Sequence, residues 1–288
     1  MEVKPVVLSD DEIDVRNKVR AFLEAELPAD RELPPLTLIS GFDKAFSKRL
    51  GEVGMAGYRL PREYGAHQGS SVEGFLLIEE MYAVQAPLQA HLIADRQAGP
   101  CIARFGSDSL RDRFLPLMAR GEVSFTVGLS EPDAGSDLAA VRATARRTDG
   151  GWLLNGTKVW ITNAHRSEFC TVLCRTSDES DRHDGLTQFI VDLTTPGLDI
   201  RPILLLDGSH HFNELAMVDV FVPDEMVLGA VGHGWTQAMS ELVYERAMPD
   251  RYMSAFPLLE GLVTEFKDEE SESVREAVGR LVARFWAI

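Results

Sequence analysis

The sequence predicts a multidomain α+β protein. An all-helical N-terminal domain (residues 1–121) precedes a middle β-barrel domain (residues 122–227) and the start of a C-terminal helical bundle (residues 228–288). Three observations predict this order: apolar residues recur at helical spacing up to Gly121, β-branched runs alternate with turn residues in the middle, and helical spacing returns after Pro223. At 288 residues, the chain exceeds the roughly 100 to 200 residues of an ordinary domain, which favours two compact units over one.

The N-terminal region carries clear helix signals. Ser9 stands before three acids, which is typical of a helix N-cap, and apolar residues then repeat along one face as far as Leu27. Further helices are expected at residues 42–55, 72–92 and 107–118. We therefore expect helices joined by polar or Pro/Gly breaks.

The middle region has the pattern of short strands. Asn155-Gly156 between two apolar runs is the signature of a tight hairpin turn. Further apolar or β-branched runs cover residues 170–175, 188–193 and 216–222. About a hundred residues of this kind predict a small barrel or sandwich.

The C-terminal region returns to helices, one at residues 235–246 and a last one with a continuous apolar stripe. The stripe consists of Val274, Val278, Leu281, Val282 and Phe285. An apolar face of this kind needs a cover, either further chain or a partner, so we expect a homo- or hetero-oligomer.

Composition excludes several classes of protein. A net charge of −16 would repel a phosphate backbone, so no nucleic-acid partner is expected. No run approaches the roughly 20 apolar residues that span a bilayer, and the acidic first residues do not resemble a secretory signal. We therefore expect a cytoplasmic protein with no membrane span.

The cysteines do not indicate a metal site. Cys101, Cys170 and Cys174 show no Cys/His spacing that resembles zinc coordination. In a cytoplasmic protein, reduced thiols packed as small apolar groups are the simplest interpretation. No metal is expected.

Two motifs in the middle region carry most of the chemical information. The first is Gly-Leu-Ser-Glu-Pro-Asp-Ala-Gly-Ser-Asp at residues 128–137, where Gly135 and Ser136 can present N–H and hydroxyl donors to an anion. The second is Lys-Val-Trp-Ile-Thr-Asn at residues 158–163, which places the Trp160 ring beside the Thr162 hydroxyl on a strand. Such a pair suits a flat cofactor with a phosphate tail. The alternative interpretation of the same residues is a solvated loop beside a tryptophan that is buried in the core.

In this order and spacing, the two motifs resemble the flavin-binding signature of the acyl-CoA dehydrogenase family, and the resemblance extends from about residue 9 to residue 246. It implies FAD between barrel and bundle, an acyl-CoA thioester against the flavin, and an electron-transfer flavoprotein as electron acceptor. The residues that it assigns to FAD are Leu129, Ser130, Gly135, Ser136, Trp160 and Thr162. Leu129 and Ser130 would meet the flavin ring, Ser136 the pyrophosphate, and Trp160 with Thr162 the other side of the isoalloxazine.

Oxidation of a thioester at Cα–Cβ also needs a base for the weakly acidic α-proton. A carboxylate in a water-poor pocket can fill this role, and the resemblance points to Glu245, on the first long helix after the barrel. The alternative is a surface acid paired with a nearby base. The same resemblance implies that Arg246, together with Ser136, contacts the substrate, where a guanidinium can hold a phosphate or carbonyl. The alternative for Arg246 is an ordinary exposed arginine.

The sequence also departs from the family. Many homotetrameric members carry an Arg-x-x-Phe-Gly segment that contacts the FAD of a neighbouring subunit, and nothing in residues 248–288 matches it. Most of the C-terminal bundle is lacking, and the acidic loop at 267–272 resembles heteromeric members that act on bulky acyl-CoA substrates, including steroid side chains.

The expected function is therefore α,β-oxidation of a fatty or steroid acyl-CoA to the trans-2-enoyl-CoA, with FAD as hydride acceptor. An acyl-CoA oxidase-type flavoenzyme and a non-catalytic subunit of a heteromeric dehydrogenase are the alternatives.

Overall fold

The computed structural model describes residues 7–28, 31, 41–177, 181–246, 249–268 and 270–287. The chain forms two compact units, each built from separate stretches of sequence. The helical unit comprises Met1–Phe42, Gly69–Leu88 and Met248–Ile288, and the mixed unit comprises Asp43–Gln68 and Gln89–Ala247. The expected boundaries at residues 121/122 and 227/228 stay predictions.

The helical unit contains α1 (Asp10–Glu26), α3 (Ser71–Ala83), α7 (Asp250–Met253), α8 (Phe256–Glu265) and α9 (Glu272–Trp286). The predicted cap of α1 is confirmed, because Ser9 Oγ accepts from the Glu12 N–H and the Glu12 carboxylate accepts from the Ser9 N–H. α1 packs on α3, and the Arg20 guanidinium makes two hydrogen bonds of 2.7 and 2.8 Å to the Glu80 carboxylate.

The helix expected over residues 72–92 is too long. α3 ends at Ala83, and Gln85 then adopts a positive φ of 50° two residues before Pro87, which has no N–H to continue a helix. Further along, in the mixed unit, the chain forms a π-helical turn, η2 (Ala94–Ala98), which leads into α4 (Gly99–Phe105). Neither element was expected.

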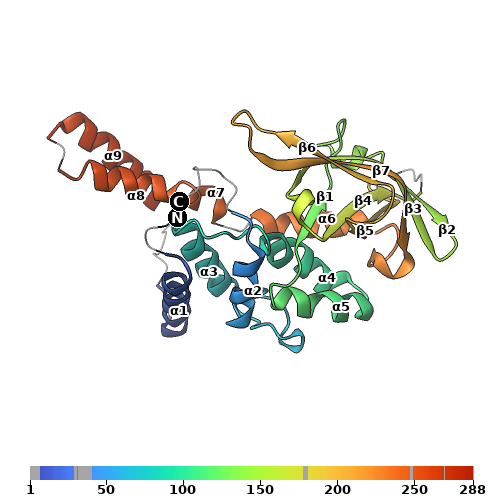
Figure 1. The fold of residues 1–288 in the computed structure, drawn as a ribbon, viewed down its shortest axis with the longest axis horizontal. Helices are drawn as coiled ribbons and strands as arrows, with labels where there is room; N and C mark the ends of the chain where they lie inside the picture. The colour runs from blue at the N-terminus through green and yellow to red at the C-terminus, as the bar shows by residue number, and fades with distance from the viewer. Residues whose placement is uncertain are drawn as a thin grey trace. The chain divides into compact units, whose positions relative to one another are not determined.

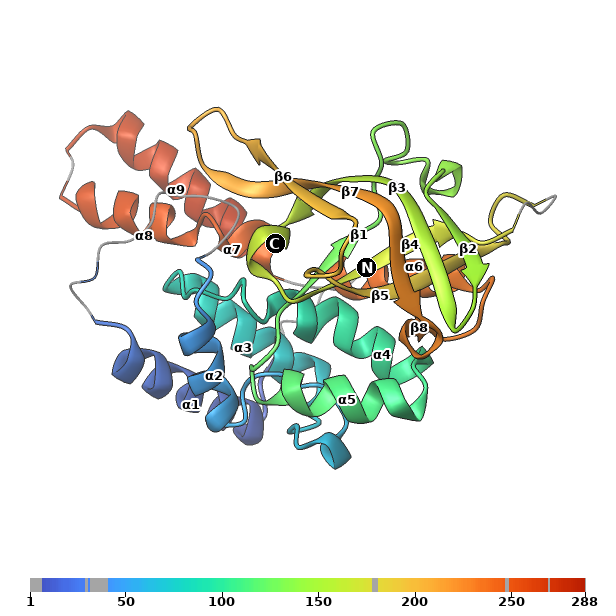
Figure 2. The same cartoon turned by 45° about the vertical axis from the view of Figure 1, so that its right-hand side comes forward.

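The remaining helices of the mixed unit agree with the sequence. α2 (Lys44–Glu52) and α5 (Asp108–Ala119) lie within or close to the expected segments, and Ser107 caps α5 through its hydroxyl. Figure 2 shows α4 and α5 side by side, and α6 (Gly234–Arg246) beside two strands of the sheet, β4 (Phe169–Arg175) and β5 (Leu186–Asp192). The helix expected at 235–246 is confirmed.

One eight-stranded sheet forms the rest of the mixed unit (Figure 1). Its strands are β1 (Phe125–Gly128), β2 (Thr144–Thr148), β3 (Gly151–Thr162), β4 (Phe169–Arg175), β5 (Leu186–Asp192), β6 (Leu198–Leu204), β7 (His210–Pro223) and β8 (Val227–Leu228). The hydrogen-bonded order is β6-β7-β3-β2-β4-β5-β8, with β1 on β4. Among the described residues, the two end strands β6 and β8 do not pair. The predicted β-rich middle domain is confirmed, but its sheet does not close into a full barrel.

The prediction of a hairpin turn at Asn155-Gly156 is wrong. Both residues lie inside β3, and the turn between β2 and β3 instead contains Gly150, with φ of 70°. Gly156 has φ of 141° at a register shift against β7, and a Cβ there would lie 2.7 Å from the Ala143 Cα. The glycine is therefore required by a strand irregularity and a close backbone approach.

The apolar stripe of α9 is partly covered within the helical unit. The Phe285 ring lies 5.7 Å from that of Tyr252 and 5.4 Å from that of Phe256. Leu281 remains 44% exposed, and α9 contributes no fully buried side chain among the described residues. The oligomer expected from this stripe stays a prediction.

Candidate functional site

The two motifs of the middle region lie against each other in the mixed unit. The first follows β1, and the second is the C-terminal half of β3. The Val159 N–H donates to the Ser130 carbonyl over 2.9 Å, so the Leu129–Ser130 segment lies beside Val159 and Trp160. The Thr126 hydroxyl donates to the Thr162 carbonyl over 2.7 Å, which ties β1 to the end of β3. Two segments about thirty residues apart in the sequence thus form one surface.

A buried ion pair holds the first motif in place. Glu131 is 8% exposed and Lys158 fully buried, and their Oε1 and Nζ atoms are 2.8 Å apart. The same lysine donates to the Leu129 carbonyl over 3.1 Å, while the carboxylate accepts from the N–H groups of Arg142 (2.7 Å) and Ala143 (2.9 Å). We call these contacts the Glu131 clamp. Its hydrogen bonds compensate the cost of burying both charges and fix both ends of the loop.

Trp160 is exposed at an irregularity of β3. Its φ is 60°, in the left-handed region, and the pairing with β7 shifts register between Lys158 and Ile161. The indole is 58% exposed, and its ring lies 6.0 Å from Phe212 at 77°. A core tryptophan is therefore the wrong interpretation. Positive φ at a bulky residue costs on the order of 1–3 kcal/mol, and strain of this kind concentrates at functional sites.

The loop that is expected to bind an anion is exposed. Gly135 and Ser136 both face solvent, and a Cβ on Gly135 would meet no atom within 4 Å. Reciprocal backbone hydrogen bonds between Glu131 and Ala134 make the preceding turn, and Asp137 pairs with Arg182. The donors of this loop are thus accessible to a ligand, and its shape does not depend on glycine at position 135.

The candidate base lies on α6, whose first half packs against the same loop. Leu129 packs on a cluster that joins the 134–141 segment to Ala238 of α6. Glu245 is half-buried and Arg246 exposed in the last turn of that helix. The structure therefore brings α6 against the first motif, with Glu245 two turns further along the helix.

Glu241 was missed by sequence reasoning. It is fully buried, and its Oε2 accepts from Gln188 Nε2 of β5 over 3.0 Å. Burial raises the pKa of Glu241 to about 7, and the negative charge of Glu245 adds to this effect, whereas the Gln188 hydrogen bond and the nearby Thr171 hydroxyl oppose it. The available signal was the spacing of Gln237, Glu241 and Glu245, which places three polar side chains on one helix face.

The cysteines behave as expected for reduced, packed thiols. Cys101, Cys170 and Cys174 are free and buried, and burial raises the pKa of each thiol. Within the described ranges, no group of three or more His, Cys, Asp or Glu side chains is placed to hold a metal ion. Nor does any helix in the described part of the chain have the length and apolar character needed to cross a membrane.

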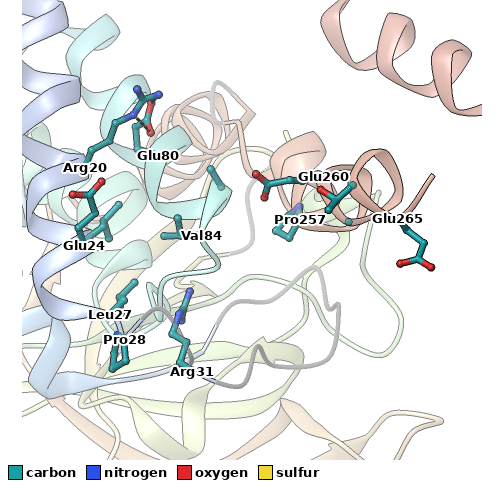
Figure 3. A pocket seen from close by; sticks show the side chains of 14 residues that line it. Arg20, Glu24, Leu27, Pro28, Arg31, Glu80, Val84, Pro257, Glu260 and Glu265 are labelled. Atoms are coloured by element: carbon teal, nitrogen blue, oxygen red, sulfur yellow. Dashed lines mark hydrogen bonds and ion pairs between the residues drawn. The ribbon is translucent and has the colours of Figure 1, made fainter. Parts of the chain in front are cut away.

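A separate cavity of about 940 Å³ lies in the helical unit (Figure 3). The Arg20–Glu80 pair borders it from α1 and α3, and Pro257, Glu260 and Glu265 of α8 border it from the other side. None of the residues expected to bind FAD or thioester lines it.

Comparison with known families agrees with this geometry. The family model for the acyl-CoA dehydrogenase N-terminal domain matches residues 9–122, and that for the middle domain matches residues 126–220. The chain belongs to the acyl-CoA dehydrogenase family. The match to the middle domain includes both motifs.

Curated relatives support the assignment. Acyl-CoA dehydrogenase FadE34 of Mycobacterium tuberculosis is 38% identical over 234 residues, which cover 81% of this chain and 33% of that protein. Acyl-CoA dehydrogenase IpdE1 of the same organism is 37% identical over 205 residues, covering 71% of this chain and 53% of that protein. This acyl-CoA dehydrogenase chain thus spans between a third and about half of these relatives.

Solved structures share the fold. The steroid ACAD Tcur3481-Tcur3483 matches with a TM-score of 0.87 and 26% identity, covering 99% of this chain and 75% of that one. An FAD complex of PigA matches with a TM-score of 0.83 and 23% identity, covering 99% of this chain and 77% of that one. At 23% identity, the similarity to PigA shows a shared fold alone.

Proposed function

We propose that this chain forms the flavin- and thioester-binding part of an acyl-CoA dehydrogenase, which oxidises the Cα–Cβ bond of a CoA thioester to the trans-2-enoyl product. The observation that carries the proposal is the surface made by the two motifs. The Val159–Ser130 hydrogen bond and the Glu131 clamp hold that surface together, and an exposed tryptophan ring stands on it.

The residues present suit FAD. The exposed Trp160 ring offers an aromatic face, and Leu129, Ser130 and Thr162 are only partly buried beside it. Gly135 and Ser136 lie on an exposed loop, where N–H and hydroxyl donors can meet a pyrophosphate. Bound at these residues, FAD would supply the hydride acceptor for Cβ.

The chain itself would supply the base. Glu245 is half-buried at the end of α6, and as a carboxylate it can take the α-proton. Arg246 is exposed next to it, and its guanidinium can hold a CoA phosphate or a carbonyl, with Ser136 as a second donor.

The comparisons support a proposal for the substrate and the partners. One solved neighbour is named a steroid ACAD, so we propose a bulky acyl-CoA, such as a steroid side chain, over a short straight chain. An electron-transfer flavoprotein would accept the electrons, and the protein would act as a homo- or hetero-oligomer. The two alternative functions are an acyl-CoA oxidase and a non-catalytic subunit of a heteromeric dehydrogenase. The following test distinguishes both from the proposed dehydrogenase.

The test is FAD stoichiometry followed by anaerobic titration with acyl-CoA. The parent protein, with a partner chain if one co-purifies, should carry FAD that bleaches on titration, and a double variant Trp160→Ala, Ser136→Ala should lose most of it. Trp286→Ala is the matched control, because Trp286 is 85% exposed in the helical unit, outside both motifs.

Unchanged FAD content in the double variant would refute the site. Bound FAD that acyl-CoA never bleaches would indicate a non-catalytic subunit. Rapid reoxidation by O₂ after bleaching would indicate an oxidase.

A further inference from the structure

Helix α6 carries a polar stripe that runs from the interior toward its exposed end. Gln237, Glu241 and Glu245 follow one another at intervals of four residues, so they share one face of the helix. Gln237 is 1% exposed and Glu241 is fully buried, whereas Glu245 is half-buried. A buried carboxyl therefore stands one turn before the candidate base.

The partners of Glu241 suit a carboxylic acid better than a carboxylate. Gln188 Nε2 donates to its Oε2, and the buried Thr171 hydroxyl faces the carboxyl without a close hydrogen bond. Glu241 Oε1, Gln188 Oε1 and Gln237 Oε1 are buried and make no hydrogen bond within the described residues. An ionised carboxyl can only accept, so it would add to this surplus of acceptors. A protonated one supplies an O–H donor and matches both the donor and the acceptor of the Gln188 amide.

The elements packed on α6 bring two cations, Arg104 of α4, whose Nη1 donates to the Ser240 hydroxyl over 3.3 Å, and Arg96 of η2. Neither guanidinium is among the groups that shift the pKa of Glu241. Two thiols face it, Cys101 of α4 and Cys170 of β4, and burial raises the pKa of both, so they are neutral at physiological pH. The turn η2 also packs on α6 and carries Asp95 and Arg96. Burial raises the pKa of Asp95 to about 8, which keeps it largely neutral as well.

We propose that Glu241 is a positioning residue for Glu245: a buried carboxylic acid, held by Gln188, whose protonation state sets the charge beside the base and hence its strength. This inference rests on the proposed function of Glu245. While Glu241 is neutral, no second charge lies one helical turn before Glu245.

Loss of the Glu241 proton changes the chemistry at Glu245. A second negative charge one turn away favours the protonated form of Glu245, so the base holds the α-proton more strongly. The pKa of Glu241, about 7, places the loss of its proton in the neutral pH range. Proton abstraction should therefore accelerate as pH rises through this range.

The first test uses the protein without substrate. Carbon-13 NMR of glutamate-labelled protein should show one carboxyl that titrates near pH 7, absent from Glu241→Gln. In Glu245→Gln its midpoint should fall by about one pH unit, because the like charge is gone. Glu225→Gln, an exposed glutamate of the same unit, should leave it unchanged. A midpoint unmoved by Glu245→Gln, or no carboxyl titrating above pH 6, would overturn the coupling.

The second test follows anaerobic flavin bleaching by acyl-CoA from pH 6 to 8.5. The parent rate should rise through the neutral range, and the rise should be absent in Glu241→Gln at equal FAD content. An identical profile in both proteins overturns the positioning role. If the NMR coupling is present but acyl-CoA bleaches neither protein, the proposed function fails and the coupled pair of carboxyls stands.

Discussion

Replacing Lys158 by methionine should show how strongly the Glu131 clamp stabilises the candidate site. Methionine keeps the apolar stem but removes the cation, and leaves the carboxylate 8% exposed with only the two backbone donors of Arg142 and Ala143. Breaking a buried pair costs about 3–5 kcal/mol. Since two charge-assisted hydrogen bonds remain, the lower end applies, and the free energy of unfolding should fall by about 3 kcal/mol.

The measurement is urea unfolding of Lys158→Met, Glu131→Gln and the double variant, with hydrogen exchange of residues 129–143 as a local reading. The double variant should be more stable than the sum of the single losses predicts, because it leaves no buried unpaired charge. Lys48→Met, at an exposed lysine of the same unit, is the control. A loss below about 0.5 kcal/mol in Lys158→Met, as small as at an ordinary surface site, would refute the clamp.

Two further predictions concern stability. Because the pKa of Glu241 is raised to about 7, the native state holds a proton that the unfolded chain releases near its ordinary pKa, so stability falls as pH rises between those values. This decline in the free energy of unfolding amounts to up to about 3 kcal/mol and should be absent in Glu241→Gln. Equal pH dependence of the melting temperature in the parent protein and in Glu241→Gln would contradict this prediction. Gly156→Ala should cost about 2 kcal/mol or more in urea unfolding, because φ is 141° and the site has no room, whereas Gly135→Ala should change stability by less than about 0.5 kcal/mol. Equal effects of the two alanines would contradict the strand irregularity.

The sequence predicted those elements whose signals are local. Ser9 and Ser107 cap helices through their own hydroxyls, and such a cap needs only the next few residues. The strand at 170–175 is an apolar run that lies in the interior of the sheet. In contrast, Asn155-Gly156 resembles a turn, but pairing of β3 with β7 keeps both residues in a strand. Contacts between distant segments overrode the local preference.

The sequence predicted which motifs form the candidate site, but not which of their side chains are buried or exposed. Both motifs could be read from residue types, but the exposure of Trp160 depends on the register of β3 against β7, a strand that begins fifty residues later. Lys158 and Glu131 lie within the two motifs, but the sequence assigned them no role, because they pair only when the loop folds back on β3. Glu241 received no role from the sequence, because its burial arises only where α6 packs against β5.

The most direct test of the account is flavin bleaching in Glu245→Gln, measured without oxygen after acyl-CoA is added to the complete protein or to its reconstituted pair. A base that acts in the transition state contributes about 100- to 10,000-fold, so bleaching should slow by that factor while FAD content and acyl-CoA binding stay near parent values. Glu225→Gln should bleach at the parent rate. Bleaching of Glu245→Gln at the parent rate would contradict the account, since the α-proton would then leave through another group.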